Sequence, residues 1–183
     1  MSDPIAIAAA DGLPSTLDLD RLALASQQLI EAGQALDAAG QVPATGGNFS
    51  CRLSDRLMAV TASGCHKGRL TSGDILVSDF AIRLQGTSRK ASDEARLHGQ
   101  LYEDLPHAQA ILHTHSRAAT VLSLCHEGDT LSLEGFELNK ALEGVKSHET
   151  AVRLAVFDNT QDIDALALDV RARLAADAGL HGY

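Results

Sequence analysis

The sequence predicts an α/β fold in which a mixed or antiparallel β-sheet is covered by helices. Apolar residues recur at helical spacing over residues 16–40 and 162–176, and short apolar runs of strand length lie between them. Strands that cluster early and then alternate with helices are typical of a sheet with helical layers. A chain of 183 residues can form one domain, expected over residues 16–183, after a flexible leader at 1–15.

Capping residues place the ends of the two N-terminal helices. Thr16 or Asp18 can cap the first helix, and Gly40 is expected to end it. Ser92 is expected to cap the second, with Glu94 in its first turn. The remaining pattern predicts a β-hairpin at 51–53 and 57–61, strands at 75–78, 81–84, 110–116, 130–133 and 152–157, helices at 117–124 and 162–176, and a helical turn at 137–142.

Composition excludes several classes of partner. The net charge of −9 argues against nucleic acid, although a local basic pocket for one phosphate remains compatible with it. The N-terminal segment lacks the basic start of a signal peptide, and no apolar run reaches membrane-spanning length, so no membrane partner is expected. Cys51, Cys65 and Cys125 form no CxxC motif, which favours reduced thiols and a cytoplasmic location.

Two histidines follow an apolar run that begins at Ala110. If this run is a strand, His113 and His115 point to the same side, roughly 7 Å apart at their Cα atoms, and can bind one metal ion between them. Leu112 and Thr114 would then pack on the opposite side. The alternative is a pair of strand-end histidines hydrogen-bonded to backbone. The other candidates have no partner at metal spacing and are expected to be structural or surface residues: His66, His98, His107, His126 and His148.

Two glycine-rich loops, at residues 45–50 and 61–68, offer backbone N–H groups in turn conformations. Such a nest binds an anion through fixed dipoles, assisted by polar side chains. Either loop alone also suits an ordinary hairpin turn. Together with a helix opening at Ser92, the loops predict a phosphate-binding site that includes Asn48, Ser63 and Lys67.

Two carboxylates are candidates for acid–base chemistry. Glu94 lies near a helix start, where the helix dipole favours a carboxylate whatever its function. Glu137 stands between Phe136 and Leu138, so it is expected to be partly desolvated, which would raise its pKa toward general-acid use.

Four segments, taken in chain order, resemble the class II aldolase/adducin-like family: residues 45–50, 61–64, 92–94 and 113–116. The similarity runs from about residue 20 to the end of the chain. Within the family, further segments look most like the enzymes that dehydrate 5-methylthioribulose 1-phosphate: residues 66–68, 134–140, 148–149 and 157–163. The resemblance implies a class II aldolase-like single domain and a homotetramer with sites near subunit interfaces.

The resemblance also implies roles for individual positions. His113 and His115 match two of three zinc-ligand histidines, which implies one Zn²⁺ per subunit. Glu94 matches the acid/base glutamate of the aldolases, and Glu137 that of the dehydratases. Asp93 departs from the small residue usual there. The positions that match phosphate contacts are Asn48, Ser63, Gly64 and Ser92, with Lys67 in the loop beside them.

The family's third histidine follows a Gly-Tyr pair. Here Gly182 and Tyr183 are the final residues, and His181 precedes them at a position that matches no ligand. The expectation is therefore that the last strand and closing helix of the family are missing from this chain.

The activity that the resemblance implies is dehydration of 5-methylthioribulose 1-phosphate to 2,3-diketo-5-methylthiopentyl 1-phosphate, a step of methionine salvage. One alternative is a zinc-dependent aldolase or epimerase of the fuculose or ribulose phosphate type, with Glu94 as acid/base. A second alternative is an adducin-like binding module without activity.

Overall fold

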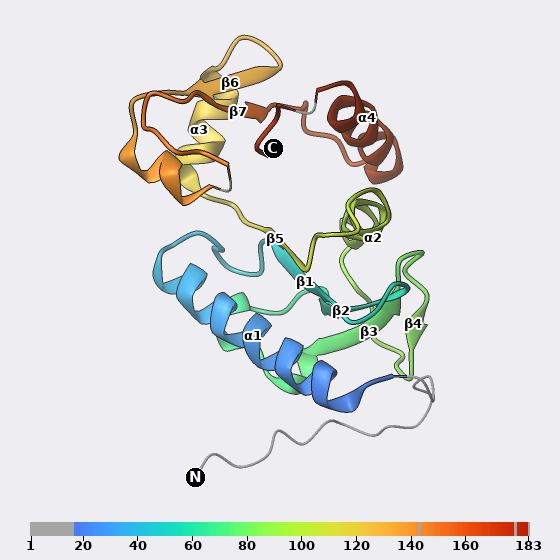
Figure 1. The fold of residues 1–183 in the computed structure, drawn as a ribbon. Helices are drawn as coiled ribbons and strands as arrows, with labels where there is room; N and C mark the ends of the chain where they lie inside the picture. The colour runs from blue at the N-terminus through green and yellow to red at the C-terminus, as the bar shows by residue number, and fades with distance from the viewer. Residues whose placement is uncertain (1–16, 143, 178, 183) are drawn as a thin grey trace. The chain divides into compact units, whose positions relative to one another are not determined.

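The computed structural model describes residues 17–142, 144–177 and 179–182, so the leader expected at 1–15 lies outside the described residues. The chain divides into two compact units, one up to Arg117 and one from Ala118 (Figure 1). The single domain expected over residues 16–183 stays a prediction. Within the described residues, no helix is both long and apolar enough to span a membrane.

The first unit contains an antiparallel five-stranded sheet. Its strand order is β4-β3-β2-β1-β5, and every neighbouring pair is antiparallel. This confirms the expected α/β class with an antiparallel sheet. The elements are α1 (Leu19–Ala38), β1 (Asn48–Arg52), β2 (Leu57–Thr61), the 3₁₀ turns η1 (Lys67–Arg69) and η2 (Ser72–Asp74), β3 (Ile75–Asp79), β4 (Leu84–Gln85), α2 (Ala95–Asp104) and β5 (Ala110–His113).

Helices cover both faces of this sheet. Side chains of successive strand residues point to opposite faces, so each central strand contributes to two buried clusters. Phe49, Cys51 and Ala59 belong to a buried cluster that includes residues of α1. The side chains of Met58 and Val60 point to the opposite face and belong to a second cluster, which includes residues of α2. The central strands are therefore buried on both sides. The sequence of β2 is mostly apolar, whereas β1 alternates polar residues with Phe49 and Cys51.

The boundaries of α1 agree with the prediction. One carboxylate oxygen of Asp18 accepts hydrogen bonds from the N–H groups of Asp20 and Arg21, at 3.0 and 3.1 Å, which satisfies two donors of the first turn. The helix ends at Ala38, and Gly40 follows in the left-handed region with φ of 68°.

The start of α2 differs from the prediction. Glu94 occupies the N-cap position and the helix begins at Ala95, so the expected cap at Ser92 is wrong. The Ser92 hydroxyl instead donates to the Glu94 carboxylate at 3.0 Å, while its carbonyl accepts the Ala95 N–H. The side-chain bond to Glu94 competes with capping, as short polar side chains commonly do.

A buried arginine fixes the far end of α2 to the sheet. Arg52 of β1 donates from Nε to the Ala108 carbonyl at 2.8 Å and from Nη2 to the Tyr102 carbonyl at 2.6 Å. Its guanidinium also lies over the rings of Tyr102 and Phe80, at 4.7 and 5.2 Å from their centroids. These contacts set the position of α2, and hence of Glu94 at its start.

The second unit contains a two-stranded antiparallel sheet, β6 with β7, flanked by helices. Asp162 caps the last helix by accepting the Ala165 N–H at 3.0 Å. His181 lies beside β7, where its Nδ1 accepts the Arg153 N–H at 3.2 Å. The elements are α3 (Arg117–Cys125), β6 (Thr130–Leu133), η3 (Glu137–Ala141), β7 (Val152–Ala155) and α4 (Ile163–Ala176), all at predicted positions, with β7 shorter than expected.

Candidate active site

Three side chains from different elements meet where β1 and β5 pair. Asn48 and His113 are cross-strand partners in the antiparallel register. The Asn48 amide donates to Oε2 of Glu94 at 3.2 Å, and the same oxygen lies 3.5 Å from Nδ1 of His113. Asn48 and Glu94 are 46 positions apart in the sequence, and Glu94 and His113 are 19 apart. The fold thus brings together three residues that the sequence analysis proposes for the site.

The two histidines lie side by side, although β5 is shorter than predicted and ends at His113. Their ring centroids are 4.7 Å apart, and the His115 N–H donates to the Gln41 carbonyl at 2.7 Å. Among the described residues, no cluster of three or more His, Cys, Asp or Glu side chains has the arrangement of a metal site. The pair therefore offers two imidazole donors with a carboxylate beside one of them.

Electrostatics keep Glu94 ionised. The neighbouring His113 ring holds the pKa of Glu94 at about 2, against a desolvation that alone would raise it, and the Ser92 hydroxyl adds a hydrogen bond to the carboxylate. Burial and the neighbouring His113 lower the pKa of His115. An ionised Glu94 accepts hydrogen bonds or a proton, but has no proton of its own to donate.

Asn48 has an unused acceptor. Its side chain is 1% exposed, and its Oδ1 is buried without a hydrogen-bond partner among the described residues. Buried polar atoms in native proteins are rarely left in this state, so the Oδ1 marks a position where a bound group or water would bond. A contact from Asn48 to substrate phosphate stays a prediction.

The second glycine-rich loop lies beside the segment that carries Ser92. An isolated bridge joins Ala62 to Ala91, and the Ser63 N–H donates to the Lys90 carbonyl at 2.8 Å. Ser63 and Gly64 are exposed, and Gly64 adopts a φ of 74° with open space around it. The loop can therefore receive a ligand from solvent.

Lys67 is buried, with 1% of its surface exposed. Its Nζ donates to the carbonyls of Thr45 and Cys65, at 3.0 and 2.7 Å, and burial lowers the pKa of the ammonium. The expected contact between Lys67 and phosphate stays a prediction, while the structure shows that two of its donors serve backbone carbonyls. No sequence motif signals such partners.

Glu137 lies in the second unit at the start of η3. Its side chain is 68% exposed, and its neighbours Phe136 and Leu138 are exposed as well, so the expected desolvation by these neighbours is wrong. The carboxylate forms ion pairs with Lys140 and, at 3.1 Å, with Nδ1 of His148. The i,i+3 spacing of Glu137 and Lys140 could have predicted their ion pair. No sequence pattern predicts the contact with His148.

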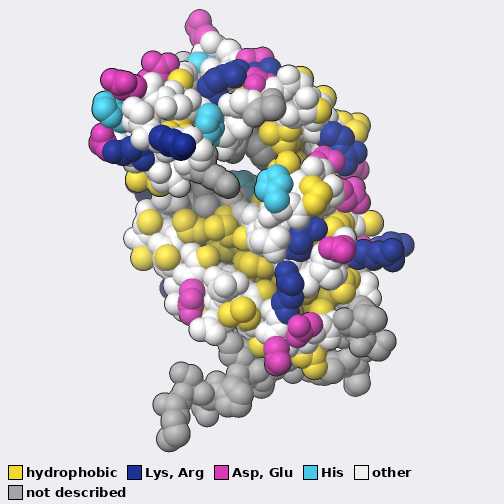
Figure 2. Space-filling model, in the orientation of Figure 1, with side chains coloured by type: hydrophobic (Ala, Val, Ile, Leu, Met, Phe, Trp, Pro, Cys, Tyr) yellow, Lys and Arg dark blue, Asp and Glu magenta, His cyan; other side chains and the backbone are white. Residues whose placement is uncertain are grey.

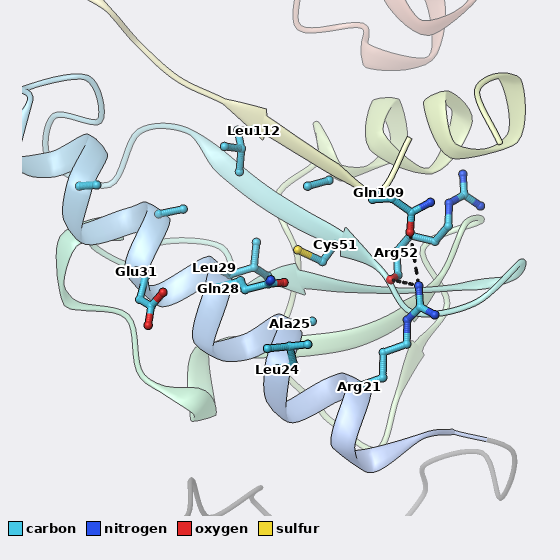
Figure 3. Close-up of a pocket in the computed structure, with 13 residues that line it drawn as sticks. Arg21, Leu24, Ala25, Gln28, Leu29, Glu31, Cys51, Arg52, Gln109 and Leu112 are labelled. Carbon is cyan, nitrogen blue, oxygen red and sulfur yellow. Dashed lines mark hydrogen bonds between the residues drawn. The ribbon is translucent and has the colours of Figure 1, made fainter. Parts of the chain in front are cut away.

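A cavity of about 600 Å³ lies between α1 and β5, away from the residues predicted to bind metal or phosphate (Figure 3). Leu112, expected to pack against a covering layer, lines this cavity and remains 46% exposed. Leu24 of α1 is 56% exposed nearby, and hydrophobic side chains gather over this region in Figure 2. Arg21 borders the cavity and donates to the Arg52 carbonyl and to Gln109.

Comparison with known proteins gives the class of this chain. The family described as Class II Aldolase and Adducin N-terminal domain matches residues 27–181. The chain therefore belongs to the class II aldolase and adducin family. It is 44% identical over 167 residues to the methylthioribulose-1-phosphate dehydratase of Marinobacter nauticus, covering 91% of this chain and 80% of that protein. The enzyme of the same name from Methylococcus capsulatus is 48% identical over 157 residues, covering 85% and 76%.

Solved structures of the family share the fold. L-fuculose-1-phosphate aldolase from Thermus thermophilus superimposes with a TM-score of 0.62 at 29% identity, over 85% of this chain and 71% of that one. A second L-fuculose 1-phosphate aldolase gives a TM-score of 0.65 at 25% identity, over 95% and 74%. The fold and family expected from the sequence are thus confirmed.

Proposed function

We propose that this chain is a hydro-lyase that dehydrates 5-methylthioribulose 1-phosphate to 2,3-diketo-5-methylthiopentyl 1-phosphate in methionine salvage. The observation that carries the proposal is the 44% and 48% identity to two dehydratases of that name over most of the chain. The geometry supports it through the cluster of Asn48, Glu94 and His113, a polar site at a sheet edge of a family fold.

We infer that zinc is the cofactor. His113 and His115 would hold it, since imidazole nitrogens are preferred zinc ligands and the two rings are adjacent. Bound zinc supplies Lewis-acid chemistry, which polarises a substrate carbonyl. Glu94 beside Nδ1 of His113 would orient this ring and leave its Nε2 as the metal-binding nitrogen, as outer carboxylates commonly do.

The two glycine-rich loops would bind the substrate phosphate. The exposed Gly64 and the Ser63 hydroxyl would contact the phosphate, and Asn48 would contact it through its amide N–H where β1 begins. The unpaired Oδ1 of Asn48 accepts only from a donor, such as a substrate hydroxyl. A phosphate held away from the reacting carbons fixes the sugar and so lowers the entropic part of the barrier.

Glu137 would act on the reacting carbons. Dehydration removes the proton at C3, expels the C4 hydroxyl as water, and leaves an enol that ketonises to the 2,3-diketone. Glu137 would take the C3 proton as base and then give that proton to the departing C4 hydroxyl as general acid, so that one carboxyl group serves both proton transfers. Its ion pairs with Lys140 and His148 would orient the carboxyl group for this role.

A second candidate function is a sugar-phosphate aldolase or epimerase with Glu94 as the acid/base group. The contact of Glu94 with His113 and the likeness to two fuculose phosphate aldolases favour it. An adducin-like module without activity is the third.

One incubation separates the three candidates. The zinc-supplemented protein is given 5-methylthioribulose 1-phosphate, fuculose 1-phosphate and ribulose 5-phosphate in parallel. Products are separated by chromatography, which resolves epimers of equal mass, and are then identified by mass spectrometry. Loss of one water from the first substrate supports the dehydratase, carbon–carbon cleavage or epimerisation of the others supports the alternative enzyme, and unchanged substrates support the binding module.

Cellular context completes the proposal. We expect a cytoplasmic enzyme that assembles as a homotetramer with its sites near subunit interfaces, as the family resemblance implies. The proposed substrate is a small phosphorylated sugar, which is an anion. Because the net charge of the protein is −9, binding this anion requires basic and N–H groups concentrated at the site. Light scattering at working concentration measures the assembly.

A further inference from the structure

The buried ammonium of Lys67 connects the two glycine-rich loops. It donates to the Thr45 carbonyl in the first loop, at 3.0 Å, and to the Cys65 carbonyl in the second, at 2.7 Å. These two carbonyls are 20 residues apart in the sequence. Lys67 therefore joins the two loops at Thr45 and Cys65, away from the strands. Where the loops meet the strands, the Thr61 hydroxyl accepts the Phe49 N–H at 3.1 Å, and Ser50 pairs with Val60 in the β1–β2 ladder.

The backbone of Lys67 is itself held against α1. A Cβ placed on Gly33 would lie 2.2 Å from the Lys67 carbonyl oxygen, so helix and loop are in direct backbone contact. One position further on, a Cβ on Gly68 would lie 2.1 Å from the Asp37 carboxylate. Lys67 thus has little freedom to move, and its ammonium reaches the carbonyls from a fixed base.

Fixing the two carbonyls also fixes two N–H groups. In a planar trans peptide the C=O and the following N–H point in opposite directions. The bonds from Lys67 therefore set the orientation of the Gly46 and His66 peptide planes as well as their positions. The Gly46 N–H donates to the Pro43 carbonyl at 3.0 Å, so the N–H that these bonds would orient toward an anion is that of His66. Backbone N–H groups in such loops are the donors that an anion nest uses.

The positive charge of Lys67 acts on the candidate active site, although its side chain does not enter that site. It acts on both Glu94 and His115 through space, while the side chain itself is 1% exposed. A buried cation of this kind is not expected to leave its carbonyl partners for a ligand, because those partners would then be left unsatisfied.

We propose that Lys67 is a positioning residue, which holds the two glycine-rich loops together for phosphate binding through the Thr45 and Cys65 carbonyls and does not contact the phosphate. This inference rests on the proposed function in one respect, the assignment of the loops to the phosphate group. It replaces the direct phosphate contact that the sequence suggested for Lys67.

The test compares Lys67→Met with Lys146→Met, since both remove one lysine and Lys146 is exposed in the second unit. Amide hydrogen exchange is measured over residues 45–50 and 61–68, and binding of inorganic phosphate is measured by calorimetry. Lys67→Met is expected to speed exchange in both loops and to weaken phosphate binding about tenfold or more, because preorganised donors are lost. Lys146→Met should match the wild type in both.

Two results would overturn the proposal. Phosphate binding that is lost while both loops keep wild-type exchange would show direct contact, and unchanged binding and exchange would show no role. If Lys67→Met does not fold, Lys67→Gln and Lys67→Arg keep an N–H donor, and the same two measurements apply to them. A wild-type protein that binds phosphate but does not dehydrate the sugar counts against the proposed function alone, since the loop measurements still decide the role of Lys67.

Discussion

Gly47 lies directly against the carbonyl oxygen of His113. A Cβ at position 47 would be 2.4 Å from that oxygen, and Gly47 has a φ of 75° that side chains rarely adopt. The first glycine-rich loop and β5 are therefore in contact through a position that only glycine fills without strain. The family resemblance predicts one site that includes both segments, and this contact brings them together in the fold.

Gly47→Ala should destabilise the protein by about 2–4 kcal/mol, because left-handed strain and a backbone clash act together. Gly64→Ala is the matched control, since Gly64 has a φ of 74° but open space around it. It should cost only about 1–2 kcal/mol, from strain alone. Urea unfolding measures both. Equal losses would show that the contact with His113 contributes no energy.

Asp74 should stabilise the second loop in a pH-dependent manner. It accepts hydrogen bonds from the Thr71 N–H and hydroxyl and from Arg89, and these bonds hold its pKa at about 2, against its burial. The folded-state pKa is depressed, so the stabilisation is present above the unfolded value of 3.8 and is lost as the pH falls toward 2.

Replacing Asp74 by Asn should therefore cost about 1–2 kcal/mol at pH 6 and almost nothing near pH 2. Unfolding in urea at pH 6, 4 and 2.5 measures the difference between variant and wild type. A difference that stays constant over this range would contradict the assignment of the stabilisation to the ionised carboxylate.

His98 should make the protein less stable in mild acid. Its ring is buried, it hydrogen-bonds the Ser50 hydroxyl at 2.8 Å, and burial lowers its pKa to about 3. The unfolded chain takes up the proton near pH 6.5 and the folded chain does not. Stability therefore falls as the pH drops from about 6.5 toward 3, by ~1.4 kcal/mol per unit.

His98→Gln should flatten this dependence between pH 6 and 4, because glutamine does not titrate. His107→Gln is the control, since His107 is exposed and should leave the slope unchanged. Denaturant unfolding at four pH values in this range gives the slopes. A wild-type slope in His98→Gln would mean that another group causes the acid sensitivity.

Zinc content should depend on the histidine pair. Purified wild-type protein is expected to bind about one zinc per subunit, and His113→Ala or His115→Ala should lower the affinity by about tenfold to a hundredfold or more. Atomic absorption after dialysis against a weak chelator measures the content, with His107→Ala as the control. Wild-type zinc in both ligand variants would place the metal elsewhere.

The fold was largely predictable because its signals are local. The Asp18 cap, the left-handed Gly40 and the apolar run of β2 each depend on a few neighbouring residues. The start of α2 was not predictable, because the hydrogen bond from Ser92 to Glu94 competes with capping.

The contacts within the candidate site were not predictable from the sequence. The resemblance selected Glu94 and His113, yet their 3.5 Å approach depends on how α2 packs beside β5. The phosphate contact of Lys67 stays a prediction. Its bonds to the Thr45 and Cys65 carbonyls were not predictable, because backbone partners carry no residue-specific signal. The exposure of Glu137 depends on whether its apolar neighbours find a partner surface, which the pattern of three residues does not encode.

The most direct test of the central claim is the turnover of 5-methylthioribulose 1-phosphate by zinc-loaded Glu137→Gln, beside the wild type and Glu149→Gln. Glu149 is an exposed glutamate of the same unit and serves as the control. The wild type and Glu149→Gln should release water from the substrate, whereas Glu137→Gln should keep its zinc and turn over at least ~10²-fold more slowly. Wild-type turnover in Glu137→Gln, or loss of its zinc, would contradict the role of this carboxylate as the general acid.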